Sequence, residues 1–220
     1  MERVPNTLVY RRVRENVRML TRHRTVADKV VPACPDWTVR ELVAHLGKVC
    51  ATAFGREWAE APAPEPPGES AGIPELLAHW EKLAGEFEQA VARGVAEMDA
   101  LLIADAVVHE GDIRVVAGQP MPAGHPAFMS TMDLGIWGFS QSLISRGLPA
   151  LSIESGDLRW VAGEGEPAAT VRGGLHDLIR SFAGRRTYQQ IAGLSWSTDP
   201  GPWHEAFTWG PFTPPAAPIE

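Results

Sequence analysis

Residues 101–117 read LLIADAVVHEGDIRVVA, and this stretch decides the fold of the chain. Spacings of four and three residues place Asp105, His109 and Asp112 on one stripe of a helix. Most of the other positions are apolar, and a helix that is apolar nearly all round should be buried. Two buried carboxylates and an imidazole cost free energy unless something satisfies them. A divalent metal ion would do so, and an open coordination position on it would make it a catalyst.

A plainer alternative makes Asp105 and His109 an exposed ion pair four residues apart on a helix surface. The apolar residues on both sides of the pair argue against that interpretation. Glu110 points about 100° away from His109 around the helix, so we do not assign it as a ligand.

A second helix supplies a further candidate ligand. Thr38 and Glu41 have the spacing of a capping box, which predicts a helix that begins at this point. His45 lies on the Leu42/Val49 edge of its apolar stripe, at the margin of the core.

His45, Asp105 and His109 together make a set of two histidines and one carboxylate. Three protein ligands with positions left for water describe a catalytic metal site better than a structural one. Asp112 is either a fourth ligand or, as we favour, an acceptor that orients an imidazole N–H group.

Bulk composition is that of a soluble globular protein. The chain has 220 residues, of which 45% are hydrophobic and 21% charged. The net charge of −7 argues against nucleic acid as the main partner. The first residues lack the apolar segment of a signal peptide, and no stretch is long and apolar enough to span a membrane. We therefore expect a cytoplasmic protein with reduced cysteines.

The pattern of apolar residues predicts an α+β protein whose N-terminal part is a four-helix bundle. Helices are expected near residues 7–24, 38–54, 74–93, 99–117 and 126–146, with a proline-rich connection at 59–72. Pro32 and Pro35 indicate a loop after the first helix, and Gly118 and Pro120 end the fourth. Short strands near 151–153, 158–161 and 168–171, a helix near 174–182 and a strand near 189–194 should follow. We thus divide the chain into a metal-binding bundle (1–148), a small α+β domain (149–196) and a tail (197–220) that is too proline-rich for a core element. The tryptophans of the tail indicate that part of it packs against another part of the protein. The basic residues of the first helix are assigned to its solvated face: Arg11, Arg12, Arg14, Arg18, Arg22, His23 and Arg24.

Two segments resemble a known family. Residues 31–46, VPACPDWTVRELVAHL, look like the first signature of the mycothiol-dependent maleylpyruvate isomerase family, and residues 105–114, DAVVHEGDIR, look like its second metal motif. Residues 171–186 resemble its C-terminal domain more weakly. These proteins belong to the broader DinB-like four-helix metalloenzymes.

The resemblance implies a divalent metal, usually zinc, held by His45, Asp105 and His109, and mycothiol as the thiol cosubstrate. It also implies thiol addition or transfer to a small electrophile, sometimes followed by isomerisation. Maleylpyruvate isomerase itself has Glu at the position of Asp105. The shorter side chain must bring its helix nearer to the metal or shift the metal, so the substrate is left open.

The function expected from this resemblance is that of an S-transferase or isomerase in which a metal-bound thiolate attacks the electrophile. The sulfur arrives with the cosubstrate, so Cys34 is interpreted as a turn residue beside Pro35. Asp112 and Arg114 are the expected catalytic residues, Arg114 as a holder of a substrate carboxylate. Arg185 and Arg186 either bind the carboxylate of the thiol cosubstrate or are surface charges.

Two alternatives remain open. One is a metal-dependent hydrolase that uses metal-bound water, and the other is a non-catalytic, metal-binding regulatory protein. The expected partners are a small electrophile and a low-molecular-weight thiol, without nucleic acid or membrane, and the protein is expected to be a monomer or a homodimer.

Overall fold

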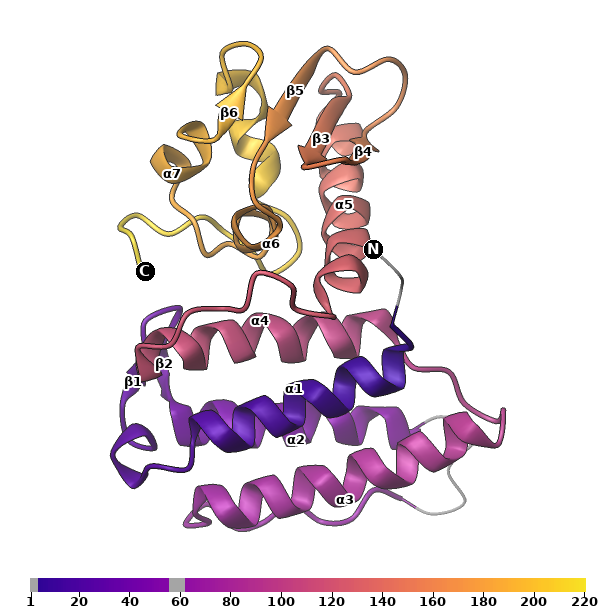
Figure 1. Cartoon of the computed structure of the whole chain (residues 1–220), viewed down its shortest axis with the longest axis vertical. Helices are drawn as coiled ribbons and strands as arrows, with labels where there is room; N and C mark the ends of the chain where they lie inside the picture. Colours follow the sequence, from indigo (N-terminus) through magenta and orange to yellow (C-terminus); the bar gives the residue numbers. More distant parts are fainter. Residues whose placement is uncertain (1–3, 56–61) are drawn as a thin grey trace. The chain divides into compact units, whose positions relative to one another are not determined.

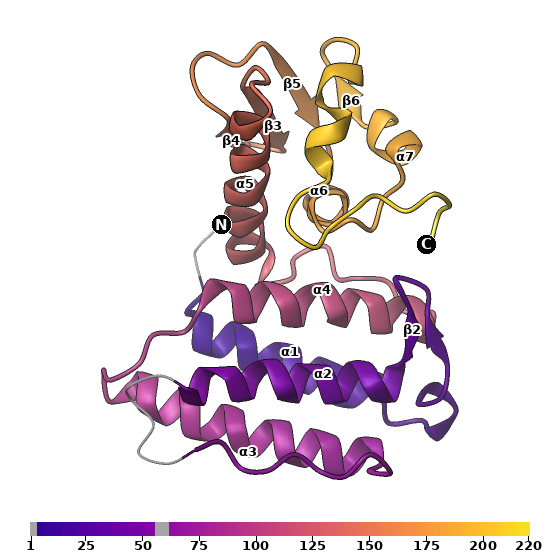
Figure 2. The ribbon, with the colours of Figure 1, turned by 180° about the vertical axis from the view of Figure 1, so that it is seen from behind.

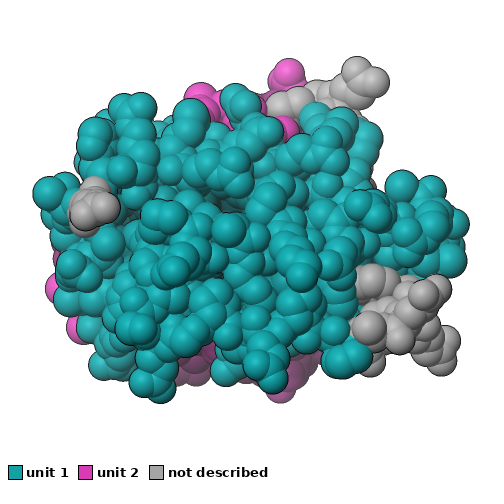
Figure 3. Space-filling model, turned by 90° about the horizontal axis from the view of Figure 1, so that it is seen from below, with its two compact units in different colours: residues 1–121 teal, residues 122–220 magenta. Residues whose placement is uncertain are grey.

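The computed structural model describes residues 4–55 and 62–220, and the chain separates into two compact units, Met1–Met121 and Pro122–Glu220 (Figure 3). The start of the connection predicted at 59–72 lies outside the described residues. Within the described ranges, no helix combines the length and the apolar character needed to cross a membrane.

The first unit is a bundle of four helices: α1 (Asn6–Leu20), α2 (Val39–Ala51), α3 (Ile73–Ala92) and α4 (Ala100–Ala117). Helices α1 and α2 each contact both α3 and α4, and the four lie side by side in both ribbon views (Figures 1 and 2). The interior is built from the predicted apolar stripes, with Val13, Val43, Trp80, Leu83 and Ile103 at most 1% exposed. The prediction of a helical bundle at the N-terminal end is thus confirmed.

A short hairpin precedes α2 and replaces the loop that Pro32 and Pro35 had suggested. Strands β1 (Val30–Val31) and β2 (Cys34–Thr38) pair antiparallel. Pro35 is tolerated because β2 has only one neighbouring strand, which leaves one edge of its backbone without ladder bonds. Since Thr38 both ends β2 and caps α2, the hairpin is joined to that helix without a linker.

Helix α4 is the most deeply buried helix of this unit. Asp99 caps its N-terminus by accepting a hydrogen bond from the Leu101 backbone N–H at 2.8 Å, and Gly118 ends it with a φ of 65°. Two of its polar residues, Glu110 and Asp112, are also buried, and the side chain of each is 0% exposed. The expectation that residues 101–117 form a buried helix is confirmed.

The basic face assigned to the first helix needs one correction. Arg14 is only 3% exposed, and its guanidinium donates to Glu81 at 3.2 Å and to Glu88 at 2.7 Å on α3. The assignment of Arg14 to the solvated face was therefore wrong. Two acidic residues about two helical turns apart on α3 make its burial possible.

The second unit combines α5 (Phe128–Ser145) with a sheet of order β4-β3-β5-β6. Strands β3 (Leu151–Ser155) and β4 (Leu158–Ala162) form an antiparallel hairpin, whereas β3 and β5 (Ala169–Arg172) run parallel. Helix α6 (Leu175–Phe182) and α5 contact each other. We had grouped α5 with the bundle, but its contacts with α6 and β4 place it in the unit that begins at residue 122.

The strand expected near residues 189–194 was also wrong. Residues 188–192 form helix α7 (Tyr188–Ala192) instead of a strand, because Thr187 and Gln190 make a capping box. The strand β6 (Ser195–Trp196) is short and lies after that helix.

The tail also contributes to the core. Residues Gly201–Phe207 form the 3-10 helix η3, in which Trp203 and Phe207 are 3% and 2% exposed. The Phe207 ring lies 4.6 Å from that of Phe139. Prolines start η3 without preventing it from packing, so the exclusion of the tail from the core was wrong, whereas the packing indicated by its tryptophans is confirmed for Trp203.

Candidate metal centre

The structure brings together the three predicted ligands, His45 from α2 and Asp105 and His109 from α4. His45 Nε2 lies 3.3 Å from Asp105 Oδ1, and His109 Nε2 lies 3.6 Å from the same oxygen. One ligand atom of each residue lies within 4.8 Å of the others. The spacing of four residues on α4 places Asp105 beside His109, and the packing of α2 against α4 brings His45 to both of them.

These separations are those that a tetrahedral metal site requires. With bonds of about 2.1 Å to nitrogen and oxygen, neighbouring donor atoms of a tetrahedral ion are about 3.4 Å apart. The two measured distances, 3.3 Å and 3.6 Å, bracket that value. The separation between the two imidazole donors is within 4.8 Å, so two of the three edges of the set match a tetrahedral ion directly.

A second observation also favours a cation. Asp105 Oδ2 is buried and has no hydrogen-bond partner among the described residues. A buried carboxylate oxygen without a partner costs about 1–3 kcal/mol or more. A divalent ion would offset this cost, so the donor set fits a metal in chemistry as well as in spacing.

The set is open to solvent on one side. The side chains of His45 and Asp105 are 26% and 22% exposed, and that of His109 is 9% exposed. A bound cation would accordingly retain coordination positions for a small molecule, as catalytic sites do.

Asp112 lies behind His109, on the far side of its ring. Its Oδ2 is 3.0 Å from His109 Nδ1, and the Asp112 side chain is fully buried. A buried carboxylate at this distance favours the tautomer with the proton on Nδ1, which leaves the Nε2 lone pair facing His45 and Asp105. The geometry therefore suits an orienting acceptor at Asp112, and its role stays a prediction.

Trp37, from β2, forms an aromatic wall beside the ligands. Its ring centroid lies 4.8 Å from that of His45 and 6.3 Å from that of His109. Its place beside both imidazoles depends on the hairpin, which the sequence pattern did not reveal.

The three arginines of the predicted site have other partners. Arg114 donates to Glu110 at 2.7 Å and to the Pro120 carbonyl at 3.1 Å. In the second unit, Arg186 donates to Asp177 at 2.8 Å and to Glu220, and Arg185 donates to the Ala183 carbonyl at 2.6 Å. Arg185 is only 8% exposed, so the alternative that it is a surface charge was wrong. The roles of all three in substrate or thiol binding stay predictions.

Comparisons with known proteins show a relationship in fold. No family model and no curated protein matches this chain. A crystal structure of a histidine-to-alanine mutant of the mycothiol-dependent maleylpyruvate isomerase aligns with a TM-score of 0.55 and 16% identity, over 90% of this chain and 97% of that one. A second structure of this isomerase gives a TM-score of 0.47 at 17% identity with the same coverage. The first of these supports a shared fold.

Proposed function

We propose that His45, Asp105 and His109 bind a divalent cation, most simply zinc, in a thiol-dependent enzyme that acts on a small electrophile. The observation that carries the proposal is the spacing of the three donor atoms around Asp105, whose second oxygen is buried without a partner. The shared fold supports it, because the aligned structure is that of an enzyme described as mycothiol-dependent. We extend the thiol class of that enzyme to this chain as part of the proposal.

The residues of the chain prepare the site in three ways. Asp112 holds the His109 ring so that Nε2 faces the other ligands. Trp37 covers the imidazoles from the side of β2 and limits the approach of a substrate. The partial exposure of His45 and Asp105 leaves that approach open on the remaining side.

A cation at this site would supply one chemical function, a lowered pKa for a thiol that enters its coordination sphere. Neither cysteine of the chain is required as a nucleophile in that reaction. Asp105 is a short ligand, which draws the cation close to α4. We therefore propose an isomerase-like or S-transferase activity without assigning maleylpyruvate as its substrate.

Metal content and thiol dependence test this proposal together. Purified protein is dialysed against zinc and assayed for bound metal, and then for turnover of a bimane electrophile with and without mycothiol. We expect about stoichiometric zinc and turnover that requires the thiol. His45→Ala and His109→Ala should lose metal and turnover together, whereas His23→Ala, at an exposed position after α1, should retain both.

The outcomes separate the alternatives. Turnover that ignores the thiol would replace the proposal with a hydrolase, and a zinc-replete protein that is inert toward thiols and electrophiles would favour a regulatory protein. Stoichiometric zinc in both histidine variants would overturn the ligand assignment.

A further inference from the structure

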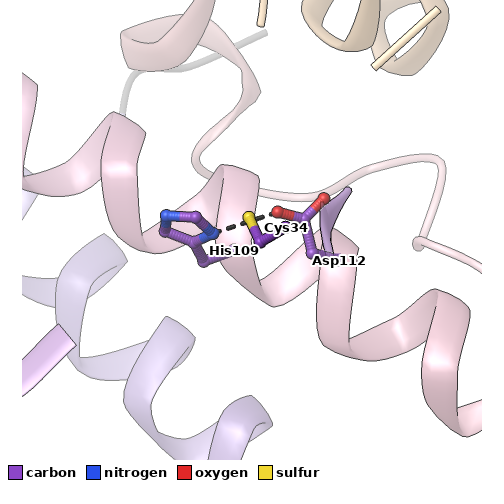
Figure 4. Close-up of side chains that lie close together, drawn as sticks. All are labelled: Cys34, His109 and Asp112. Carbon is purple, nitrogen blue, oxygen red and sulfur yellow. Dashed lines mark hydrogen bonds and ion pairs between the residues drawn. The ribbon is translucent and has the colours of Figure 1, made fainter. Parts of the chain in front are cut away.

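His109 belongs to a second cluster of potential ligands. Cys34, from β2, and Asp112, from the next turn of α4, each offer one ligand atom within 4.8 Å of the other and of His109 (Figure 4). Asp112 bonds Nδ1 of the ring, and the Cys34 sulfur lies on that same side of it (Figure 4). The first set uses the opposite ring nitrogen, Nε2. His109 therefore lies between two groups of donors that approach it from opposite sides.

The chemistry of the second cluster differs from that of the first. It contains a thiol, an imidazole and a carboxylate, and the thiol favours a soft, thiophilic cation such as cadmium over zinc. Asp112 is 1% exposed and His109 is 7% exposed, so a cation between them would be largely withdrawn from water. The distance of 3.0 Å between His109 Nδ1 and Asp112 Oδ2 needs to open by only about 0.4 Å to match a tetrahedral edge.

We infer that Cys34, His109 Nδ1 and Asp112 form a second cation position that is selective for thiophilic metals and is mutually exclusive with the first. A neutral imidazole has one nitrogen with a free lone pair and one that carries the proton. A cation on Nδ1 places that proton on Nε2, which then cannot bind a cation beside His45 and Asp105. Binding at the second position rests on its own three residues, and the exclusivity rests on the proposed function of the first.

A consequence for activity follows from this exclusivity. Thiophilic cations should inhibit the proposed enzyme by capturing His109 from the site that it shares with His45. The Cys34 thiol would lose its proton on binding, and the cation would be held by two anionic donors and one neutral donor. Cys34 would thus be the residue through which thiophilic cations inhibit the proposed enzyme.

The test is a cadmium titration of the full chain. A phosphine serves as the reductant, so that no thiol reductant competes with the protein for cadmium. Thiolate-to-cadmium charge transfer gives an ultraviolet absorption band that oxygen and nitrogen ligands do not. We expect this band in the wild type and in His45→Ala, which leaves the second cluster intact. Cys34→Ser should abolish the band, and Asp112→Asn should shift it to cadmium concentrations roughly a thousandfold higher, because an anionic ligand is lost from a three-ligand site.

Cys50 is the matched control for Cys34. It lies on α2 and is fully buried, and this burial raises the pKa of its thiol to about 11. Cys50→Ser should therefore keep the band. Circular dichroism of each variant distinguishes a lost site from a lost fold, and Cys34→Ala repeats the test if the serine variant is unstable.

Each outcome bears on a different part of the inference. A band that is absent from the wild type, or that survives in Cys34→Ser, would overturn the second position. Two cations bound per wild-type chain at saturation would overturn the exclusivity, because His109 would then bridge them. Persistence of the band in His45→Ala while zinc binding is lost would separate this position from the first.

Discussion

Helix α4 carries two carboxylates, Glu110 and Asp105, that are satisfied in opposite ways. Glu110 is 0% exposed and accepts hydrogen bonds from Arg114 at 2.7 Å and from Asn16 at 3.0 Å. Asp105 is paired in the described part of the chain only with two histidines, and one of its oxygens has no partner. The protein thus supplies an internal cation for Glu110, whereas the cation that we propose for Asp105 would come from outside. This contrast separates a carboxylate that stabilises the bundle from one that is prepared for binding.

The largest effect that tests this contrast should come from removing the charge of Asp105. Asp105→Asn should weaken zinc binding by about a thousandfold, or about 4 kcal/mol, because an anionic ligand is lost from a three-ligand site. Competition with a chromogenic zinc chelator measures this. The free energy of unfolding of the metal-free protein should be unchanged or higher, because a buried carboxylate without a cation has been neutralised. A large loss of that stability would show that Asp105 is structural.

The converse variant is Glu110→Gln. It should lower the free energy of unfolding by about 3 kcal/mol, since it leaves the Arg114 guanidinium without its anionic partner. Urea denaturation measures the change. Zinc affinity should stay within a few fold of the wild type, and a loss comparable to that of Asp105→Asn would remove the distinction between the two carboxylates.

Asp112 should give a smaller effect on the metal. Asp112→Asn keeps the shape of the side chain but weakens its hold on the His109 N–H group, and should reduce zinc affinity by about 10–100-fold. The same chelator assay applies. Abolished binding would make Asp112 a direct ligand, and unchanged binding would leave it without a role in the first site.

The smallest effect on stability is expected for Glu41, the exposed carboxylate in the capping box of α2. Hydrogen bonds from the Thr38 backbone N–H and hydroxyl lower the pKa of Glu41 below its ordinary value of 4.5. Its stabilising contribution is therefore complete above pH 4.5 and is lost as the pH falls through the lower folded pKa.

Glu41→Gln should therefore make the melting temperature less sensitive to pH below 4.5. Its zinc affinity at neutral pH should change little. Glu69→Gln, at an exposed position, serves as the control. Equal acid sensitivity of Glu41→Gln and wild type would show that the capping box contributes no pH-dependent stability.

The sequence predicted those parts of the fold that are encoded locally. The capping box of Thr38 and Glu41 and the glycine at 118 each act within one or two helical turns, and both gave correct helix ends. Thr187 and Gln190 carry the same signal, yet the apolar residues after them were interpreted as a strand. A capping signal was thus more reliable there than the type of residue that followed it.

The candidate site was predictable only in part. Asp105, His109 and Asp112 share one helix, so their spacing alone fixed their relation. Trp37 and Cys34 reach the same region through the β1–β2 hairpin, where pairing between segments decides the position and Pro35 suggested a break. The contact of Asn16 with Glu110 likewise depends on the packing of α1 against α4, whereas Arg114 reaches the same carboxylate from four residues further along α4.

The central claim is that one cation binds His45, Asp105 and His109, and anomalous diffraction at the zinc edge from zinc-loaded crystals tests it most directly. The account predicts a single anomalous peak at about 2.0–2.2 Å from His45 Nε2, His109 Nε2 and an Asp105 carboxylate oxygen. An absence of zinc from these residues in crystals of the loaded protein, or a peak bonded to only one of the three, would contradict it.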